Sequence, residues 1–113
     1  MMNVLFELTM PGKGSWNGKW SGDENRHFII MSISREDEMR YKLDEKLDKS
    51  FYYSWTDGWT ACIHVKRITG REAVQLRDKS KGICGYDWMV YSILNEGYIE
   101  SPIEKRRRLE QKV

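Results

Sequence analysis

The side chains best suited to bind a ligand are aromatic rings in a glycine-rich segment and a run of basic residues near the C-terminus. Residues 12–22 contain four glycines, two tryptophans and two lysines, and residues 105–108 read Lys-Arg-Arg-Arg. An aromatic ring stacks on a nucleobase, and the planar guanidinium group of arginine donates paired hydrogen bonds to a phosphate. Together these residue types predict a binding site for a nucleotide-sized anion.

Catalytic side chains are few, and their spacing matches no common arrangement. His27 and His64 both lie in strand-like segments, the two cysteines are far apart in the sequence, and no GxSxG, Walker or HExxH motif is present. Asp57 and Asp87 lie in predicted turns and keep open an enzyme that uses carboxylates. We expect a protein that binds its ligand without cleaving it and needs no cofactor or metal.

The distribution of charge favours a focused anion site. The net charge is +2, but residues 101–113 contain five basic and two acidic residues, a local charge of +3, which leaves −1 for the first 100 residues. A broad nucleic-acid-binding face would spread lysine and arginine over the whole fold. A nucleic-acid partner is therefore not expected, and the basic segment is expected to act locally.

Length and composition predict one domain covering residues 1–113. A chain of this size can bury one hydrophobic core. The N-terminus shows no signal-peptide pattern, and no apolar run approaches the roughly 18 residues of a membrane-spanning helix. We expect a cytoplasmic protein with free thiols and no membrane partner.

Four strand-like segments predict a small antiparallel sheet. Residues 3–10 alternate between apolar and polar, whereas residues 27–33 form a continuous apolar run that is expected at the sheet centre. Residues 51–55 and 59–66 also alternate, and the Asp57-Gly58 pair between them is a strong hairpin signal.

Helical patterns occupy most of the C-terminal half. The predicted fold class is α+β, with about four strands packed against helices in the order ββαββααα. The first expected helix is a surface helix over residues 35–49 that begins after Ser34, and the second runs from Thr69 towards Gly82 with Ala73, Val74 and Leu76 inward. A central helix follows, with Tyr86, Met89, Val90, Ile93 and Leu94 inward. The last expected helix is the basic C-terminal one.

The C-terminal helix has a clear start but little to hold it in place. Ser101, Pro102 and Glu104 occupy the N-cap, N1 and N3 positions of a capping box. Ile103 and Leu109 are its only large apolar residues before residue 113. A helix with such a weak apolar stripe either frays or packs on a neighbouring chain, and we expect residues 101–113 to lie at a subunit interface in a homodimer or higher homo-oligomer.

Three segments resemble the first-described family of phage Thoeris anti-defence proteins. They are residues 5–11 with the following Gly14-Ser15-Trp16-Asn17-Gly18-Lys19-Trp20, the Asp57-Gly58-Trp59 hairpin, and residues 80–89, which read Ser-Lys-Gly-Ile-Cys-Gly-Tyr-Asp-Trp-Met. The resemblance implies a small α+β protein, expressed in the host bacterial cytoplasm, that sequesters glycocyclic ADP-ribose between two subunits without cleaving it.

The resemblance also implies the ligand-binding residues. Trp16 is the expected stacking ring, and the arginines of residues 105–108 are expected near the phosphates. Ile83 stands where a second aromatic ring is expected, which departs from the family pattern. The expected ligand-binding set is Trp16, Asn17, Ile83, Gly85, Asp87, Arg106, Arg107 and Arg108.

Two other functions remain open from the residues. In the first, the aromatic rings stack on single-stranded nucleic acid and the basic end grips its backbone, which predicts strongly salt-dependent binding. In the second, the protein is a subunit of a larger phage assembly and its exposed rings are interface contacts, which predicts no small ligand.

Overall fold

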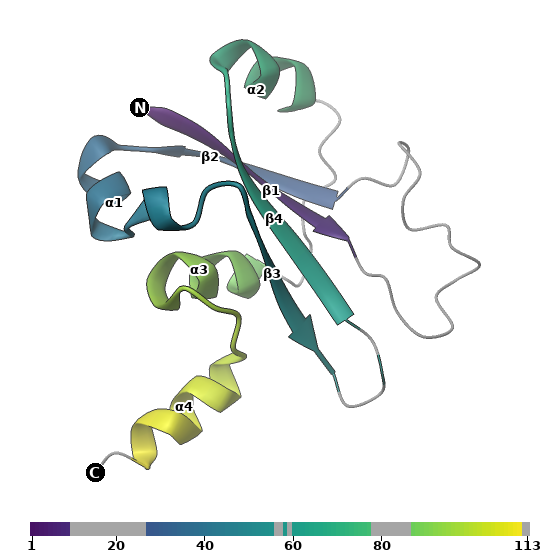
Figure 1. Cartoon of the computed structure of the whole chain (residues 1–113), viewed down its shortest axis with the longest axis vertical. Helices are drawn as coiled ribbons and strands as arrows, with labels where there is room; N and C mark the ends of the chain where they lie inside the picture. Colours follow the sequence, from purple (N-terminus) through teal and green to yellow (C-terminus); the bar gives the residue numbers. More distant parts are fainter. Residues whose placement is uncertain (10–26, 56–57, 59, 78–86, 112–113) are drawn as a thin grey trace.

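A four-stranded antiparallel sheet forms the centre of the molecule (Figure 1). The computed structural model describes residues 1–9, 27–55, 58, 60–77 and 87–111. The predicted α+β class and the element order ββαββααα are confirmed. The strands are β1 (Met2–Thr9), β2 (His27–Ile33), β3 (Lys49–Ser54) and β4 (Thr60–Ile68), arranged in the order β2-β1-β4-β3.

Helices cover both faces of the sheet. They are α1 (Arg35–Arg40), the short 3-10 helix η3 (Leu43–Glu45), α2 (Gly70–Arg77), α3 (Asp87–Glu96) and α4 (Pro102–Glu110). Alternate residues of β1 point to opposite faces: Val4 and Phe6 belong to the main core with α3, whereas Leu5 packs in a smaller cluster with Ala73 of α2. No helix in the described ranges is long and apolar enough to cross a membrane.

The apolar pattern of the central helix is confirmed at four of its five predicted inward positions, and the fifth, Tyr86, lies outside the described residues. Met89, Val90, Ile93 and Leu94 of α3 are all buried, and Gly97 ends the helix with a φ of 82°, in the left-handed region that glycine adopts without strain. The periodicity of 3.6 residues therefore fixes both the helix and the face it turns to the sheet.

The prediction that residues 27–33 lie at the sheet centre is wrong, because β2 is at the edge of the four-stranded sheet and, among the described strands, pairs only with β1. The strand itself is present, and both of its faces are covered. Phe28 packs in the α2 cluster, whereas Ile29 and Ile33 pack in the main core. A continuous apolar run thus indicates that both faces of a strand are covered, and this is possible for an edge strand as well as for a central one.

The predicted surface helix over residues 35–49 is also wrong in its length. The capping interaction is present, since Ser34 Oγ accepts a hydrogen bond from the backbone of Asp37, but α1 ends at Arg40. Lys42 then adopts a φ of 50°, and the turn buries Leu43 completely. In a continuous helix Leu43 would lie on the same side as Met39, which is 76% exposed. The turn instead buries Leu43, and the free energy of this burial favours the turn over a continuous helix.

One inward residue of the next helix was predicted incorrectly. In α2, Ala73 is buried and Leu76 is half-buried, but Val74 is 66% exposed. This helix meets the sheet along a narrow strip around Leu5 and Ile68, so a residue one position away from Ala73, about 100° around the axis, faces solvent.

Candidate ligand-binding groove between α3 and α4

The C-terminal helix starts at a capping box and is joined to the sheet by one side chain. Ser101 Oγ accepts from the backbone N–H of Glu104, and the Glu104 carboxylate accepts from the backbone N–H of Ser101, as the sequence predicts. The same carboxylate oxygen accepts a hydrogen bond of 2.6 Å from the hydroxyl of Tyr53 on β3. These contacts fix where α4 begins relative to the sheet.

A shallow groove of about 330 Å³ runs between α3 and α4. We call it the α3–α4 groove. It combines two aromatic rings with acidic side chains and one lysine. Its lining residues are Asp87, Trp88, Tyr91, Ser92, Asn95, Glu96, Glu100, Pro102 and Lys105.

One ring of the groove is held by Tyr53 of β3, which also contacts Trp55 just after that strand. Trp88 is half-buried and lies edge-to-face with Tyr53, with ring centroids 5.4 Å apart, and Tyr53 makes a similar contact of 5.0 Å with Trp55. Tyr91, one helical turn beyond Trp88, is 51% exposed. The groove therefore contains one ring fixed by packing and one ring open to solvent, which suits stacking on a planar ligand.

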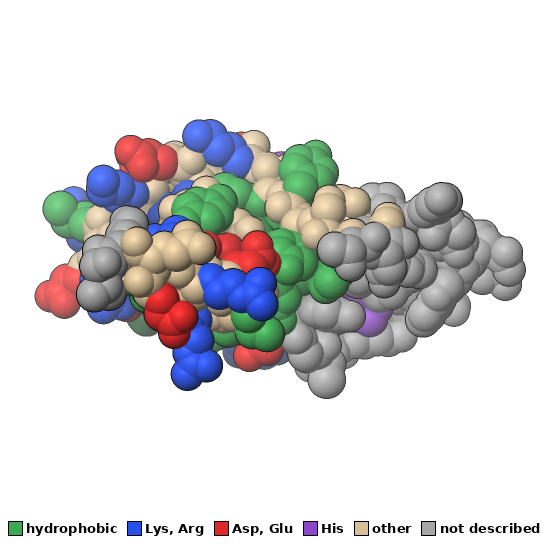
Figure 2. Space-filling view, turned by 90° about the horizontal axis from the view of Figure 1, so that it is seen from below, with side chains coloured by type: hydrophobic (Ala, Val, Ile, Leu, Met, Phe, Trp, Pro, Cys, Tyr) green, Lys and Arg blue, Asp and Glu red, His purple; other side chains and the backbone are tan. Residues whose placement is uncertain are grey.

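Two acidic side chains that line the groove are paired with Lys105, which also lines it, and with Arg108. Lys105 Nζ lies 2.9 Å from Glu96, and Arg108 Nη2 lies 2.7 Å from Glu100 and 3.4 Å from Glu96. Figure 2 looks at this end of the molecule and shows basic and acidic side chains next to one another with hydrophobic side chains between them. The carboxylates thus neutralise Lys105 and Arg108 in the structure as it stands.

Two hydrogen-bonded groups near the groove have altered pKa values. The hydrogen bond from Tyr53, followed by that from Ser101, holds the pKa of Glu104 below its ordinary value. The same bond to Glu104 raises the pKa of Tyr53, and burial adds to the increase. Across neutral pH, a neutral phenol therefore donates to an ionised carboxylate.

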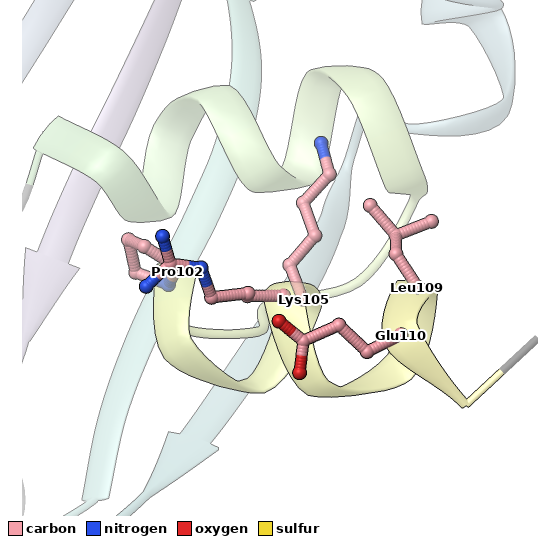
Figure 3. A pocket seen from close by; sticks show the side chains of 5 residues that line it. Pro102, Lys105, Leu109 and Glu110 are labelled. Carbon is pink, nitrogen blue, oxygen red and sulfur yellow. The ribbon is translucent and has the colours of Figure 1, made fainter.

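The remaining arginines lie on the outer sides of α4. Arg106 and Arg107 are exposed, and in the described part of the chain neither is within ion-pair distance of a carboxylate. Arg106 borders an open hollow on the helix surface with Pro102, Lys105, Leu109 and Glu110. Figure 3 shows Lys105 pointing from α4 towards α3. The hollow and the α3–α4 groove share Pro102 and Lys105, so they form one continuous surface.

The structure brings some of the predicted ligand-binding residues into one neighbourhood. Asp87 begins α3 and lines the groove, and Arg106 borders the adjoining hollow. Arg107 is exposed and lines neither the groove nor the hollow, whereas Arg108 is paired with Glu96 and Glu100. Trp16, Asn17, Ile83 and Gly85 lie outside the described residues, as do Asp57 and the cysteine at position 84.

The two histidines lie on opposite faces of the sheet. His64 pairs across the strands with Glu7, and His27 pairs with Leu8, the next residue of β1. His64 Nδ1 is 3.0 Å from Ser50 Oγ. Within the described ranges no group of three or more His, Cys, Asp and Glu side chains could hold a metal ion.

Sequence reasoning missed most of the groove. Trp88 and Tyr91 are spaced three residues apart, just outside the buried stripe of α3, and this second aromatic stripe is a signal that the pattern already contained. The acidic residues gave no such signal, since Glu96 and Glu100 meet their basic partners only after the chain turns at Gly97. No protein-family model, curated protein or solved structure matches this chain.

Proposed function

We propose that this protein binds and sequesters a cyclic ADP-ribose-type nucleotide, glycocyclic ADP-ribose, without cleaving it, and that it thereby acts as a phage anti-defence protein against Thoeris-type immunity. The nucleotide and its biological setting come from the resemblance of residues 5–20, 57–59 and 80–89 to that family. The chemistry of an aromatic, phosphate-bearing ligand is supported independently by the surface around α4.

The observation that carries the proposal is that exposed arginines of α4 lie near two rings of α3, one half-buried and one exposed. Arg106 and Arg107 extend from a helix whose start is fixed by a capping box, and Trp88 and Tyr91 line the groove beside it. Arginine meets phosphate oxygens in bidentate fashion, and tryptophan and tyrosine stack on adenine. This surface therefore offers both kinds of contact that a dinucleotide-like signal requires.

The proposal includes a homo-oligomer in which α4 lies at the interface between subunits. No residue of α4 is buried, and Ile103 and Leu109 are 64% and 50% exposed. Burying these exposed apolar side chains against a second copy of the chain would be energetically favourable. Sedimentation at micromolar concentration is expected to give a dimer or a larger assembly, and a clean monomer would contradict an intersubunit site.

The direct test compares two pairs of exposed arginines. Titration calorimetry with glycocyclic ADP-ribose is expected to show binding by the wild-type protein. The double variant Arg106→Gln/Arg107→Gln should bind at least about tenfold more weakly, since a charge-assisted hydrogen bond contributes roughly 1.5–3 kcal/mol. The matched control, Arg71→Gln/Arg77→Gln on α2, removes the same charge from another part of the molecule and should bind like the wild type. Equal loss in both variants would indicate only a general charge effect.

A second measurement separates sequestration from catalysis. A site that binds the ground state does not by itself accelerate a reaction. The nucleotide incubated with excess protein should disappear from solution and return intact after the protein is heat-denatured, as measured by mass spectrometry. Recovery of cleaved product in molar excess over the protein would establish an enzyme instead.

Single-stranded nucleic acid is the alternative ligand favoured by the same side chains. An exposed Tyr91 and two exposed arginines also suit stacking on a base and contact with a phosphate backbone. Strong, steeply salt-dependent binding of an oligonucleotide, with no binding of glycocyclic ADP-ribose, would replace the proposed function with this one.

A further inference from the structure

Three consecutive arginines on α4 have different surroundings. Arg106 and Arg107 are exposed, whereas the side chain of Arg108 is only 33% exposed and faces α3. Consecutive residues of a helix are rotated by about 100°. If one arginine is held against α3, the directions of the other two are therefore set.

Arg108 meets Glu100 with two donors. Its Nη2 lies 2.7 Å from Glu100 Oε1, and its Nε lies 3.3 Å from Glu100 Oε2, so the guanidinium group contacts both carboxylate oxygens. The same Nη2 is 3.4 Å from Glu96 at the end of α3. This paired geometry requires the planar fork of arginine, which lysine does not have.

The carboxylate that receives Arg108 is itself fixed in place. The side chain of Glu100 is 8% exposed, and its backbone N–H donates to Ser92 Oγ at 2.9 Å. Ser92 Oγ in turn donates to the carbonyl of Tyr98 at 2.8 Å. Ser92 therefore fastens the connection between α3 and α4 onto α3, and Glu100 presents a buried acceptor at a defined position.

Few other contacts hold the far end of α4. No residue of the helix is buried, and Lys105 forms a half-exposed ion pair with Glu96. Tyr53 holds the first turn through Glu104, two turns of helix away from the last residues. Of the three ion pairs that α4 forms with described residues, the one between Arg108 and Glu100 has the most buried partner.

We propose that Arg108 is a positioning residue, and that its paired contact with Glu100 docks α4 against α3 so that Arg106 and Arg107 point outward as the anion-binding side chains. The second half of this statement rests on the proposed function, whereas the docking role does not. The division of roles is not visible in the sequence, where the three arginines are equivalent.

The docking role is tested by amide hydrogen exchange of residues 105–110, with residues 89–94 of α3 as the internal reference. Arg108→Gln is expected to accelerate exchange in α4 about tenfold relative to the wild type. Arg106→Gln and Arg107→Gln, which remove the same charge from the same helix, should change it by less than about twofold. Unchanged exchange of α3 in every variant would show that the core stays folded.

Two further variants distinguish positioning from a general structural effect. Glu100→Gln should accelerate α4 exchange, and the double variant should exchange no faster than Arg108→Gln alone, because Arg108→Gln already removes the contact with Glu100 together with the longer one to Glu96. Arg108→Lys should rescue the exchange rate only in part, since it keeps the charge but not the fork. Additive effects, or equal acceleration by all three arginine variants, would overturn the proposal.

Nucleotide titration then separates the two proposals. If glycocyclic ADP-ribose binds, Arg108→Gln should weaken binding less than Arg106→Gln/Arg107→Gln does, and Arg108→Lys should recover part of the loss. A larger loss for Arg108→Gln, without faster exchange, would make Arg108 a direct ligand contact and reject its positioning role. If the wild type binds no nucleotide, the proposed function fails while the exchange result still decides the role of Arg108.

Discussion

The helices α3 and α4 follow one another in the chain and have similar lengths, but only α3 contributes to the core. Four residues of α3 are buried against the sheet, whereas α4 buries none and is held by a capping box, a tyrosine hydroxyl and ion pairs. Apolar burial depends little on pH or salt, whereas exposed ion pairs are screened by salt. The position of α3 is therefore fixed by apolar packing, whereas the position of α4 depends on charged contacts that respond to pH and salt.

The largest expected difference comes from shortening one isoleucine on each helix. Ile93 is fully buried, and Ile93→Ala should lower the free energy of unfolding by about 2–5 kcal/mol through lost burial and a cavity. Ile103 is 64% exposed, and Ile103→Ala should change it by less than about 0.5 kcal/mol in a monomer. Urea unfolding of both variants measures this, and similar losses would mean that α4 is part of the core.

The second test concerns Lys46, a buried lysine that follows η3 and contacts the C-terminal part of α3. Lys46 Nζ donates to the carbonyl of Leu94 at 2.7 Å and also to the carbonyl of Tyr41, so it joins α3 to the turn after α1. Burial lowers its pKa. Lys46→Met should destabilise the fold by about 1–3 kcal/mol because two carbonyls lose their donor. Lys49→Met, at an exposed position of β3, is the matched control, and an equal effect of both in urea unfolding would argue against this link.

A smaller and more local effect is expected at the start of α4. Tyr53→Phe keeps the edge-to-face ring contacts but removes the hydrogen bond to Glu104. The cost should be about 0.5–1 kcal/mol because the bond is open to solvent. Amide exchange should quicken in the first turn of α4 and stay unchanged in α3. Tyr52→Phe, whose ring is 65% exposed, is the control, and a response of α3 in either variant would contradict a local role.

The smallest effect concerns pH. The pKa of Glu104 is lowered by its hydrogen bonds, so their contribution is complete above its ordinary value of 4.5 and is lost as the pH falls through the lowered value. The pKa of Tyr53 is raised, so its contribution is complete below 10.0 and is lost as the pH rises through the raised value.

Amide chemical shifts of α4 should accordingly stay constant between about pH 5 and 9 and change on either side, while those of α3 stay constant further in both directions. Tyr53→Phe should abolish the alkaline change and move the acid change to higher pH, because the bond from Tyr53 is the largest cause of the lowered pKa of Glu104. Changes of α3 and α4 that coincide at both ends would show that the two helices unfold together.

Much of the fold was predictable where the signal lies within a few residues. The alternation in β1, the hairpin strands, the four described positions of the buried stripe of α3 and the capping box at Ser101 are confirmed. Each depends on backbone geometry and on neighbours one or two turns away, so the local sequence contains the information.

The predictions that failed needed knowledge of distant neighbours. The run at residues 27–33 indicated two covered faces, but only the pairing order placed β2 at the edge. Residues 35–49 were expected to form one long surface helix, but Leu43 is buried in the core and the chain turns at Lys42. In both cases tertiary packing overrode a local pattern.

The sequence alone was enough to predict an α+β fold, a central helix with a defined inner face and a C-terminal helix whose N-cap is Ser101. Only the tertiary structure decided that Trp88 and Tyr91 face a groove with Lys105, and that Arg108 is paired with Glu100 while Arg106 and Arg107 are exposed. Helix periodicity and caps act over one or two turns, whereas the partner of a charged side chain depends on how separate elements are oriented after folding.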